Sequence, residues 1–331
     1  MSRINKNLVL AIPVMLLLGF GAGLVFDPTP LKVLILPFTF LMVYPMMVNL
    51  KFKKVLEGGD TKAQVITQVI NFTLLPLLAF GLGRLFLADR PYLVLGLLLV
   101  GIIPTSGMTI SWAGLAKGNV EAAIKMTVVG LILGALATPF YVQWLAGAGL
   151  AMDPVSIARQ MAIIVFLPLA AGFTTRRLLI RRLGRADFQK RLAPKFPPYS
   201  TLGVLAIVFI AMALKSETIV ASPQVLLRIT LPLILFYTAS YLLSTIIGRA
   251  TLDRPDALAL VFGSSMRNLS IALALAINAF GPSGSEAALV VAVAYVIQVQ
   301  SAAWYVKLSG GGSRQWAAGE REPVKVRAGQ G

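Results

Sequence analysis

The 331-residue sequence contains no cysteine and no histidine. These absences exclude disulfides, thiolate metal sites, cysteine nucleophiles and histidine proton relays. Charge is also scarce, because Asp, Glu, Lys and Arg make up only 13% of the chain, against about 25% in an ordinary soluble domain. Negative charge is the rarer sign, with 13 acidic residues beside 30 basic ones.

Hydrophobic residues, by contrast, make up 57% of the chain, and apolar stretches of about 20 residues recur along its length. This pattern is typical of a polytopic helical membrane protein. The net charge of +17 could suggest nucleic acid, but the basic residues stand in short loops between apolar stretches, so we expect no nucleic-acid partner. Because nine similar stretches follow the first one, we interpret residues 7–26 as a retained helix rather than a signal peptide.

We therefore predict an all-α membrane protein with ten transmembrane helices. The predicted spans are 8–26, 31–50, 63–87, 92–116, 120–145, 157–179, 200–215, 225–248, 255–281 and 286–307. If the N-terminus is cytoplasmic, 23 of the 30 basic residues fall on the inner side. This bias follows the positive-inside rule and predicts a plasma (inner) membrane protein with both termini in the cytoplasm.

Five spans on each side of a Gly/Ala-rich segment indicate two inverted five-helix repeats, residues 1–150 and 151–307. The second repeat contains the basic cytoplasmic loop 176–199, which could bind the headgroups of membrane lipids or serve only as a topology determinant and linker. The Gly-rich, polar tail 308–331 is predicted to be disordered.

The fourth predicted span of each half is interrupted. The first is broken at 104–107 (PTSG) and the second at 263–265 (GSS). Two breaks at equivalent places indicate discontinuous helices that cross near the middle of the membrane. Amide ends there would favour an anion, whereas carbonyl ends could hold Na⁺ or a proton-bearing group.

Arg267 is the one charge in the apolar run 257–285, and an arginine in mid-membrane costs roughly 2.5–3.5 kcal/mol. The acidic residues all fall at span ends, in loops or in the tail, so we expect none of them to neutralise it. Either an anionic substrate is its counter-charge, or the guanidinium snorkels or bonds to carbonyls exposed by the break. The candidate substrate-binding residues are Arg267, Asn268, Ser264, Ser265, Ser270, Thr105, Ser106, Gly107, Thr109 and Ser111.

Several short motifs resemble the bile acid:sodium symporter superfamily, which includes the ACR-type arsenite permeases. These motifs are Val43-Tyr44-Pro45-Met46, Asn71-Phe72 with Pro76 and Ala79, Leu115 to Asn119 (LAKGN), and Asn268 to Gly281. The resemblance covers nearly all ten spans. It implies a panel domain of spans 1, 2, 6 and 7, a core domain of spans 3–5 and 8–10, and alternating access between them.

The matched positions also differ from that superfamily. The permease cysteine falls on Thr105 and its glutamate on Ser270, while the sodium-binding glutamate of the symporters falls on Gly263. Because a neighbouring symporter glutamine falls on Arg267, this arginine could act as a fixed internal cation in place of sodium. For a Na⁺ or H⁺ coupling ion, the remaining candidate ligands are Asn71, Thr127 and Gln298, although Gln298 suits interhelical hydrogen bonding equally well.

We predict a secondary active transporter that moves a small anionic or oxyanion solute by alternating access. Arsenite efflux by a cysteine-free route is an alternative, as is a non-transporting membrane sensor or scaffold. An enzyme is not expected, because no carboxylate pair, nucleophile with a base, or metal cluster stands at membrane depth, and no cofactor is predicted. Lys125 and Arg159, which lie near span ends, are expected to snorkel toward water.

Overall fold

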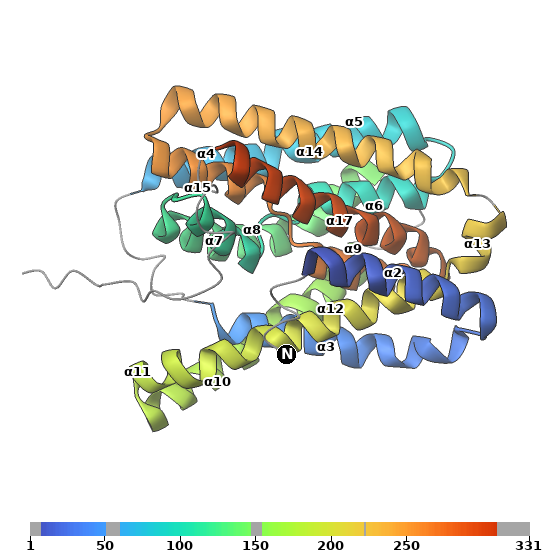
Figure 1. The fold of residues 1–331 in the computed structure, drawn as a ribbon, viewed down its shortest axis with the longest axis horizontal. Coiled ribbons are helices and arrows are strands. Elements are labelled where there is room, and N and C mark those ends of the chain that lie inside the picture. Colours follow the sequence, from blue (N-terminus) through green and yellow to red (C-terminus); the bar gives the residue numbers. More distant parts are fainter. Residues whose placement is uncertain (1–7, 51–59, 147–153, 222, 310–331) are drawn as a thin grey trace, which may run out of the picture.

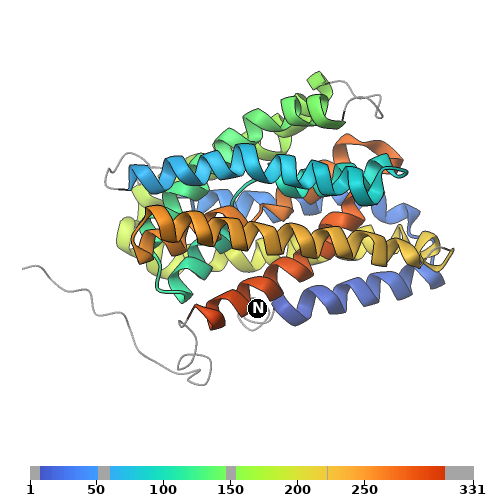
Figure 2. The ribbon, with the colours of Figure 1, turned by 90° about the horizontal axis from the view of Figure 1, so that it is seen from above.

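The computed structural model describes residues 8–50, 60–146, 154–221 and 223–309 (Figure 1). All regular structure in these residues is helical, and the long helices run roughly parallel to one another (Figure 1 and Figure 2). Eight helices are long and apolar enough to cross a membrane, or nine if the bent pair α6–α7 forms one span; a shorter apolar helix covers Ala11–Val25. The predicted all-helical membrane architecture is confirmed, whereas ten spans in two inverted repeats remain a prediction. The predicted tail lies almost entirely outside the described residues.

One group of helices forms the lower part of the molecule in Figure 1. Its members are α2 (Leu8–Val25), α3 (Ile35–Val48), α10 (Leu167–Leu183) and α12 (Phe196–Ala213). Helix α2 packs closely on α12, because a Cβ atom added at Gly19 or Gly23 would lie within 2.4 Å of a backbone oxygen of α12. Small residues that let backbones approach are a common basis of helix association in membranes.

A second group of helices forms the upper part of the molecule. Its members are α4 (Thr61–Val69), α5 (Leu75–Leu87), α6 (Pro91–Ile102), α7 (Gly107–Leu115), α8 (Val120–Tyr141), α14 (Gln224–Thr251), α15 (Arg254–Ser265), α16 (Leu269–Ala279) and α17 (Gly284–Leu308). A π-helical turn, η3 (Ile70–Leu74), joins α4 to α5 without a loop. The remaining pieces are η1 (Thr29–Leu34), η4 (Val142–Ala146), α9 (Pro154–Met161), η5 (Ala162–Phe166), α11 (Arg185–Asp187), η6 (Phe188–Leu192), η7 (Ala193–Lys195), α13 (Ser216–Ala221) and η8 (Gly281–Ser283).

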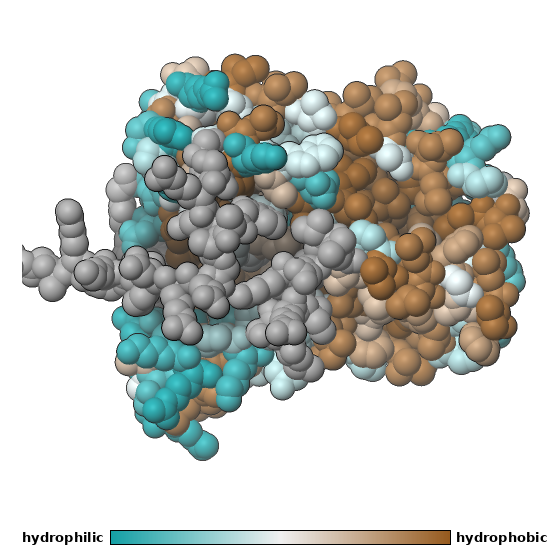
Figure 3. Space-filling view, in the orientation of Figure 1, coloured by the Kyte–Doolittle hydropathy of each residue, from teal (hydrophilic) through white to brown (hydrophobic). Residues whose placement is uncertain are grey.

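The surface matches a protein that lies in a bilayer. On the face shown in Figure 3, hydrophobic side chains form a broad belt, and hydrophilic ones gather toward the two ends. The basic segment α10–α11–η6 projects from the body at one of these ends (Figure 1). The chain is thus an integral membrane protein with a charged projection on one side.

The first interruption separates α6 from α7 by four residues and bends the pair by 59°. Pro104 has no N–H to continue α6, and Thr105 has a φ of 50°, which few residues other than glycine adopt. Ser106 then starts α7, because its side chain accepts a hydrogen bond from the backbone N–H of Met108. Local sequence chemistry therefore explains where one helix stops and the next begins.

Glycines of α8 make room for this irregular segment. A Cβ atom at Gly130 would lie 2.6 Å from Thr105 Oγ1, and one at Gly134 would lie 2.7 Å from Pro104 Cδ. Both distances are too short for a real contact. The approach of α8 to the break thus depends on the missing side chains of two glycines that stand one helical turn apart.

The second interruption covers residues 266–268, between α15 and α16. The prediction that this break lies at 263–265 is wrong, because those residues form the last turn of α15. Met266 has φ −84° and ψ 90°, outside the helical region, and Asn268 caps α16 by accepting from the N–H of Ile271. The backbone N–H of Asn268 donates to the carbonyl oxygen of Ile103 at 3.0 Å. The two interruptions are therefore in direct contact.

The packing of α8 against the first break can be tested with glycine variants. We expect Gly130→Ala to lower the free energy of unfolding by about 1–3 kcal/mol, because the new methyl group would overlap Thr105. Gly81→Ala is the matched control, since nothing lies within 4 Å of its added Cβ, and it should leave stability unchanged or slightly higher. Thermal unfolding of the purified variants in detergent measures both. Equal melting temperatures for the two would contradict the packing described.

Candidate functional site

Arg267 lies at the contact between the two interruptions and has no solvent-exposed surface. Its Nε donates to the carbonyl oxygen of Val100 at 3.0 Å, and its Nη2 donates to that of Gly101. Its Nη1 donates to the carbonyl oxygen of Ser264 at 3.0 Å and to Asn71 Oδ1 at 2.5 Å. The guanidinium is thus surrounded by oxygen atoms from three separate parts of the chain.

These carbonyl groups are the ones that the interruptions leave without helical partners. The residue four positions after Val100 is Pro104, which has no N–H to offer. The residue four positions after Ser264 is Asn268, whose N–H is used instead by Ile103. Since an unpaired buried carbonyl costs about 1–3 kcal/mol, Arg267 stabilises both helix ends at once.

A neighbouring amide network completes this pairing. The N–H of Arg267 donates to Gln298 Oε1 at 2.8 Å rather than continuing α15, and Tyr237 donates to the same oxygen at 2.9 Å. The carbonyl of Gly263, left free by that change, accepts from Asn71 Nδ2 at 3.1 Å. Asn71 therefore bonds both to Arg267 and to the break.

The charge of Arg267 has no carboxylate partner in the part of the chain that the structure describes. Of the interpretations offered by the sequence, hydrogen bonding to carbonyls of the break is the arrangement found, and snorkelling is not. Carbonyl dipoles stabilise the cation without cancelling its charge. A net positive charge thus remains beside the interruptions and would still favour an anion nearby.

A cavity of about 600 Å³ lies between the two helix groups. The lower group contributes residues of α2, α3 and α12, and the upper group contributes residues of α7, α16 and α17. Its lining consists of Ile12, Met46, Asn49, Leu50, Ser106, Gly107, Met108, Ile110, Ser111, Trp112, Leu115, Pro197, Ser200, Thr201, Val204, Ser270, Tyr295 and Val299. None of these side chains is charged, so polar recognition there depends on hydroxyl groups, amides and helix ends.

Four of the candidate substrate-binding residues line this cavity. Ser106 and Gly107 stand at the N-terminus of α7, Ser111 one turn later, and Ser270 in the first turn of α16. Two helix N-termini therefore have first-turn residues on the same cavity. The N-terminal end of a helix carries partial positive charge even where caps satisfy some of its N–H groups, as Ser106 and Asn268 do here, and this charge favours an anion.

The other six candidates lie outside the lining. They are Arg267, Asn268, Ser264, Ser265, Thr105 and Thr109. Thr105 Oγ1 faces the carbonyl groups of Met126 and Thr127 in α8, and Thr109 Oγ1 donates to the carbonyl of Phe262. These buried hydroxyl groups hold the interruptions against neighbouring helices.

The three candidate ion ligands also have partners. Asn71 and Gln298 bond to Arg267, as described above, and Thr127 Oγ1 donates to the carbonyl of Ala123 at 2.8 Å. Asn71 and Gln298 are both completely buried, and Thr127 nearly so. In this conformation the guanidinium occupies the space at which the oxygens of Asn71 and the break converge.

Some lining residues were missed by the sequence analysis. Tyr295 of α17 forms a hydroxyl pair with Ser270 at 2.7 Å, and Asn49 and Ser200 reach the cavity from the lower group. The sequence does not show that polar residues of α3 and α12 face α7, because this depends on how the helices pack. The two interruptions predicted lining residues from the upper helix group but none from the lower group.

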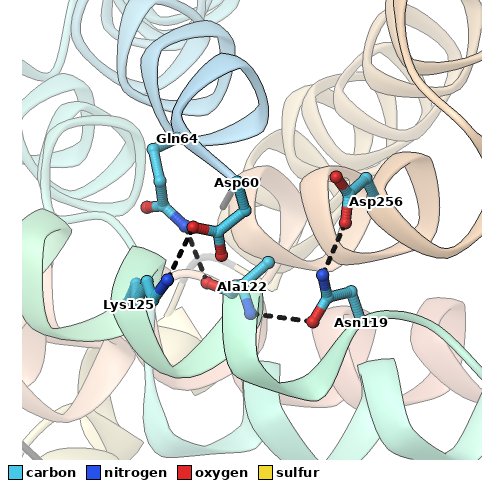
Figure 4. Close-up of polar contacts among 6 residues, drawn as sticks. All are labelled: Asp60, Gln64, Asn119, Ala122, Lys125 and Asp256. Carbon is cyan, nitrogen blue, oxygen red and sulfur yellow. Dashed lines mark hydrogen bonds and ion pairs between the residues drawn. The ribbon is translucent and has the colours of Figure 1, made fainter. Parts of the chain in front are cut away.

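Lys125 does not snorkel, which corrects the prediction for that residue. It is buried in α8, and its Nζ lies 2.8 Å from Asp60 Oδ1 at the start of α4 (Figure 4). Nearby, Asn119 donates to Asp256 of α15 at 2.7 Å (Figure 4). These contacts tie α4, α8 and α15 together at one end of the upper group, because a buried lysine needs a partner.

Comparison with known proteins adds family information. A family model described as the Sodium Bile acid symporter family matches residues 36–222, more than half of the chain. The Arsenical-resistance protein Acr3 of Corynebacterium glutamicum is 25% identical over 74% of this chain and 70% of its own length. The protein of the same name from Alkaliphilus metalliredigens is 24% identical, over 84% and 81%. The Uncharacterized sodium-dependent transporter YocS of Bacillus subtilis is 27% identical, over 66% of each chain.

The pairing of Arg267 with the interruptions can be tested by stability. We expect Arg267→Ala to lower the melting temperature by about 5 °C or more, because several buried oxygen atoms lose their donors together. Arg267→Lys should give an intermediate value, since an ammonium group can reach only some of these oxygens. Arg228→Ala, which breaks an exposed pair with Asp89, is the control and should change little. An unchanged melting temperature for Arg267→Ala would contradict the hydrogen bonds described.

Proposed function

The chain belongs to the Sodium Bile acid symporter family and is a membrane transporter of that family, and we propose that it moves a small anionic or oxyanion solute by alternating access. The family is one of transporters rather than enzymes. One observation carries the proposal: two helix N-termini, backed by an arginine without a carboxylate partner in the described residues, meet at an uncharged cavity between two helix groups.

The solute would bind at the N-terminal ends of α7 and α16. Ser106, Ser111 and Ser270 supply hydroxyl groups, and the first N–H groups of both helices supply partial positive charge. Arg267 adds a full positive charge behind the break, where desolvation strengthens its field. Apolar residues such as Met46 and Trp112 would contact the remainder of the solute.

Alternating access would move one helix group against the other. The cavity is lined by both groups, so a relative shift would open it first to one side of the membrane and then to the other. We propose further that the repeats 1–150 and 151–307 have inverted topology and that both termini face the cytoplasm at the plasma membrane. The distribution of basic residues supports this orientation.

Coupling to an ion is the second part of the proposal. YocS is named as sodium-dependent, which makes Na⁺ a candidate, with H⁺ as the other. In this chain, however, we propose that Arg267 takes the place of one cation, because its guanidinium lies among oxygens of Asn71, Val100, Gly101 and Ser264. A cation that belongs to the protein cannot be released, so binding of the anion at the break would need no sodium there.

A thermal-shift screen tests the solute class. Purified protein is mixed with carboxylates, oxyanions and bile acids, with and without sodium, and we expect an anion to raise the melting temperature in both conditions. In Ser111→Trp the new ring fills the cavity, and the shift should be lost while the melting temperature without ligand is kept. Thr73→Trp, on an exposed position away from the cavity, is the matched control. A shift that persists in Ser111→Trp would contradict the site.

Arsenite efflux is the second candidate, because two relatives are named as arsenical-resistance proteins. Thr105 and Ser270 stand where the resemblance places the cysteine and the glutamate of the permeases, and the hydroxyl of Thr105 faces α8 rather than the cavity. We therefore expect that expression of the chain in an arsenite-sensitive bacterium gives no gain in resistance. A clear gain in arsenite resistance that is absent in Ser111→Trp would mean that the transported solute is a metalloid rather than an anion.

A further inference from the structure

A second cavity, of about 360 Å³, lies where α14 ends, α15 begins and α17 ends. These three helix ends lie on the same side of the molecule as α11 (Figure 1). Two arginines, Arg249 and Arg254, line the cavity together with the hydroxyl groups of Thr245 and Tyr305. It is separate from the solute cavity, with which it shares no lining residue.

The two arginines retain free hydrogen-bonding capacity. Arg254 donates to the carbonyl oxygen of Ser309 at 2.9 Å, and within the described residues neither guanidinium forms an ion pair. Asp253, the neighbouring acid, uses Oδ1 to accept from the N–H of Asp256 at the start of α15. Guanidinium groups present N–H pairs that match the oxygens of a phosphate, so the cavity has the donors and the charge for one.

The helix surface beside the arginines is apolar and exposed. Leu242, Ile246 and Arg249 of α14 are spaced by four and three residues, so they lie along one helical face. Leu242 is 57% exposed, Ile246 is 64% exposed, and Leu308 at the rim of the cavity is 85% exposed. In an integral membrane protein such a face meets lipid chains, and here the face leads directly to a phosphate-sized group of donors.

We infer that this cavity binds the headgroup phosphate of an acidic phospholipid, whose acyl chains lie along the Leu242–Ile246 face of α14. The hydroxyl groups of Thr245 and Tyr305, 2.8 Å apart, would contact the remaining headgroup oxygens. Because the site joins α14, α15 and α17, bound lipid would brace the helix that leads to Arg267. Free phosphate would satisfy the arginines but would leave the apolar face uncovered.

Native mass spectrometry and thermal unfolding of the full chain in detergent test this inference. Dioleoyl phosphatidylglycerol should remain bound in the mass spectrum and should raise the melting temperature by about 5 °C at saturation. Dioleoyl phosphatidylcholine, with the same chains and no net charge, should raise it far less. In the double variant Arg249→Gln, Arg254→Gln, the apparent affinity for phosphatidylglycerol should fall roughly tenfold or more.

The variant Arg228→Gln is the matched control. Arg228 lies on the same helix α14, toward its opposite end, and pairs with Asp89, so its removal should leave lipid binding unchanged. Both exposed arginines of the double variant lie at helix ends, and its melting temperature without lipid reports whether the fold is intact. Equal lipid affinity in the double variant and the wild type would overturn the inference.

Inorganic phosphate distinguishes a lipid headgroup from a soluble phosphate compound as the ligand of this cavity. Any shift that millimolar phosphate produces should persist in the double variant, and phosphate should not displace phosphatidylglycerol. A phosphate-induced shift as large as that of the lipid, lost in the double variant, would assign the cavity to a soluble phosphate compound instead. Failure of this inference is distinguishable from failure of the proposed function: Ser111→Trp alters only the cavity between the two helix groups, and the double variant alters only this one.

Discussion

The pairing of one buried guanidinium with the carbonyl groups of two broken helices is the interaction on which the rest of the structure depends. Interrupting a helix inside a membrane leaves carbonyl groups without donors, and no water is available to supply them. Arg267 supplies several at once, to Val100, Gly101 and Ser264. The cost of burying its charge is offset because those same carbonyls, together with Asn71, surround it with negative dipole ends.

This arrangement separates the two kinds of helix end. The carbonyl ends of α6 and α15 face the guanidinium, whereas the first turns of α7 and α16 reach the cavity between the two helix groups. The positive ends thereby lie toward the cavity, and the negative ends are occupied by the guanidinium. This separation is the structural basis of our proposal that the solute is an anion. Arg267 also holds the two breaks together and, as part of the chain, cannot dissociate.

Much of this could be predicted from sequence, because some constraints act over short distances. Pro104 marks the first interruption, since proline lacks an N–H, whereas the small residues 263–265 lie just before the second one, which begins at Met266. Arg267 stood out as a lone charge in an apolar run. The outcome differed for Lys125, which was expected to reach water and instead meets Asp60, 65 residues earlier in the chain. The local sequence pattern around Lys125 does not predict a partner so far away in the chain.

The sequence by itself determined the class of protein, the approximate positions of most long helices and the first interruption, because hydrophobicity and backbone chemistry are local properties. Only the tertiary structure decided which atoms accept hydrogen bonds from Arg267 and which hydroxyl groups line the cavity. Asn71 and Arg267 are 196 residues apart, and their contact depends on how η3 packs against the second interruption. The rotation of a helix about its axis depends on the helices packed against it. When nearly every face of a helix is apolar, the hydrophobic pattern does not specify that rotation.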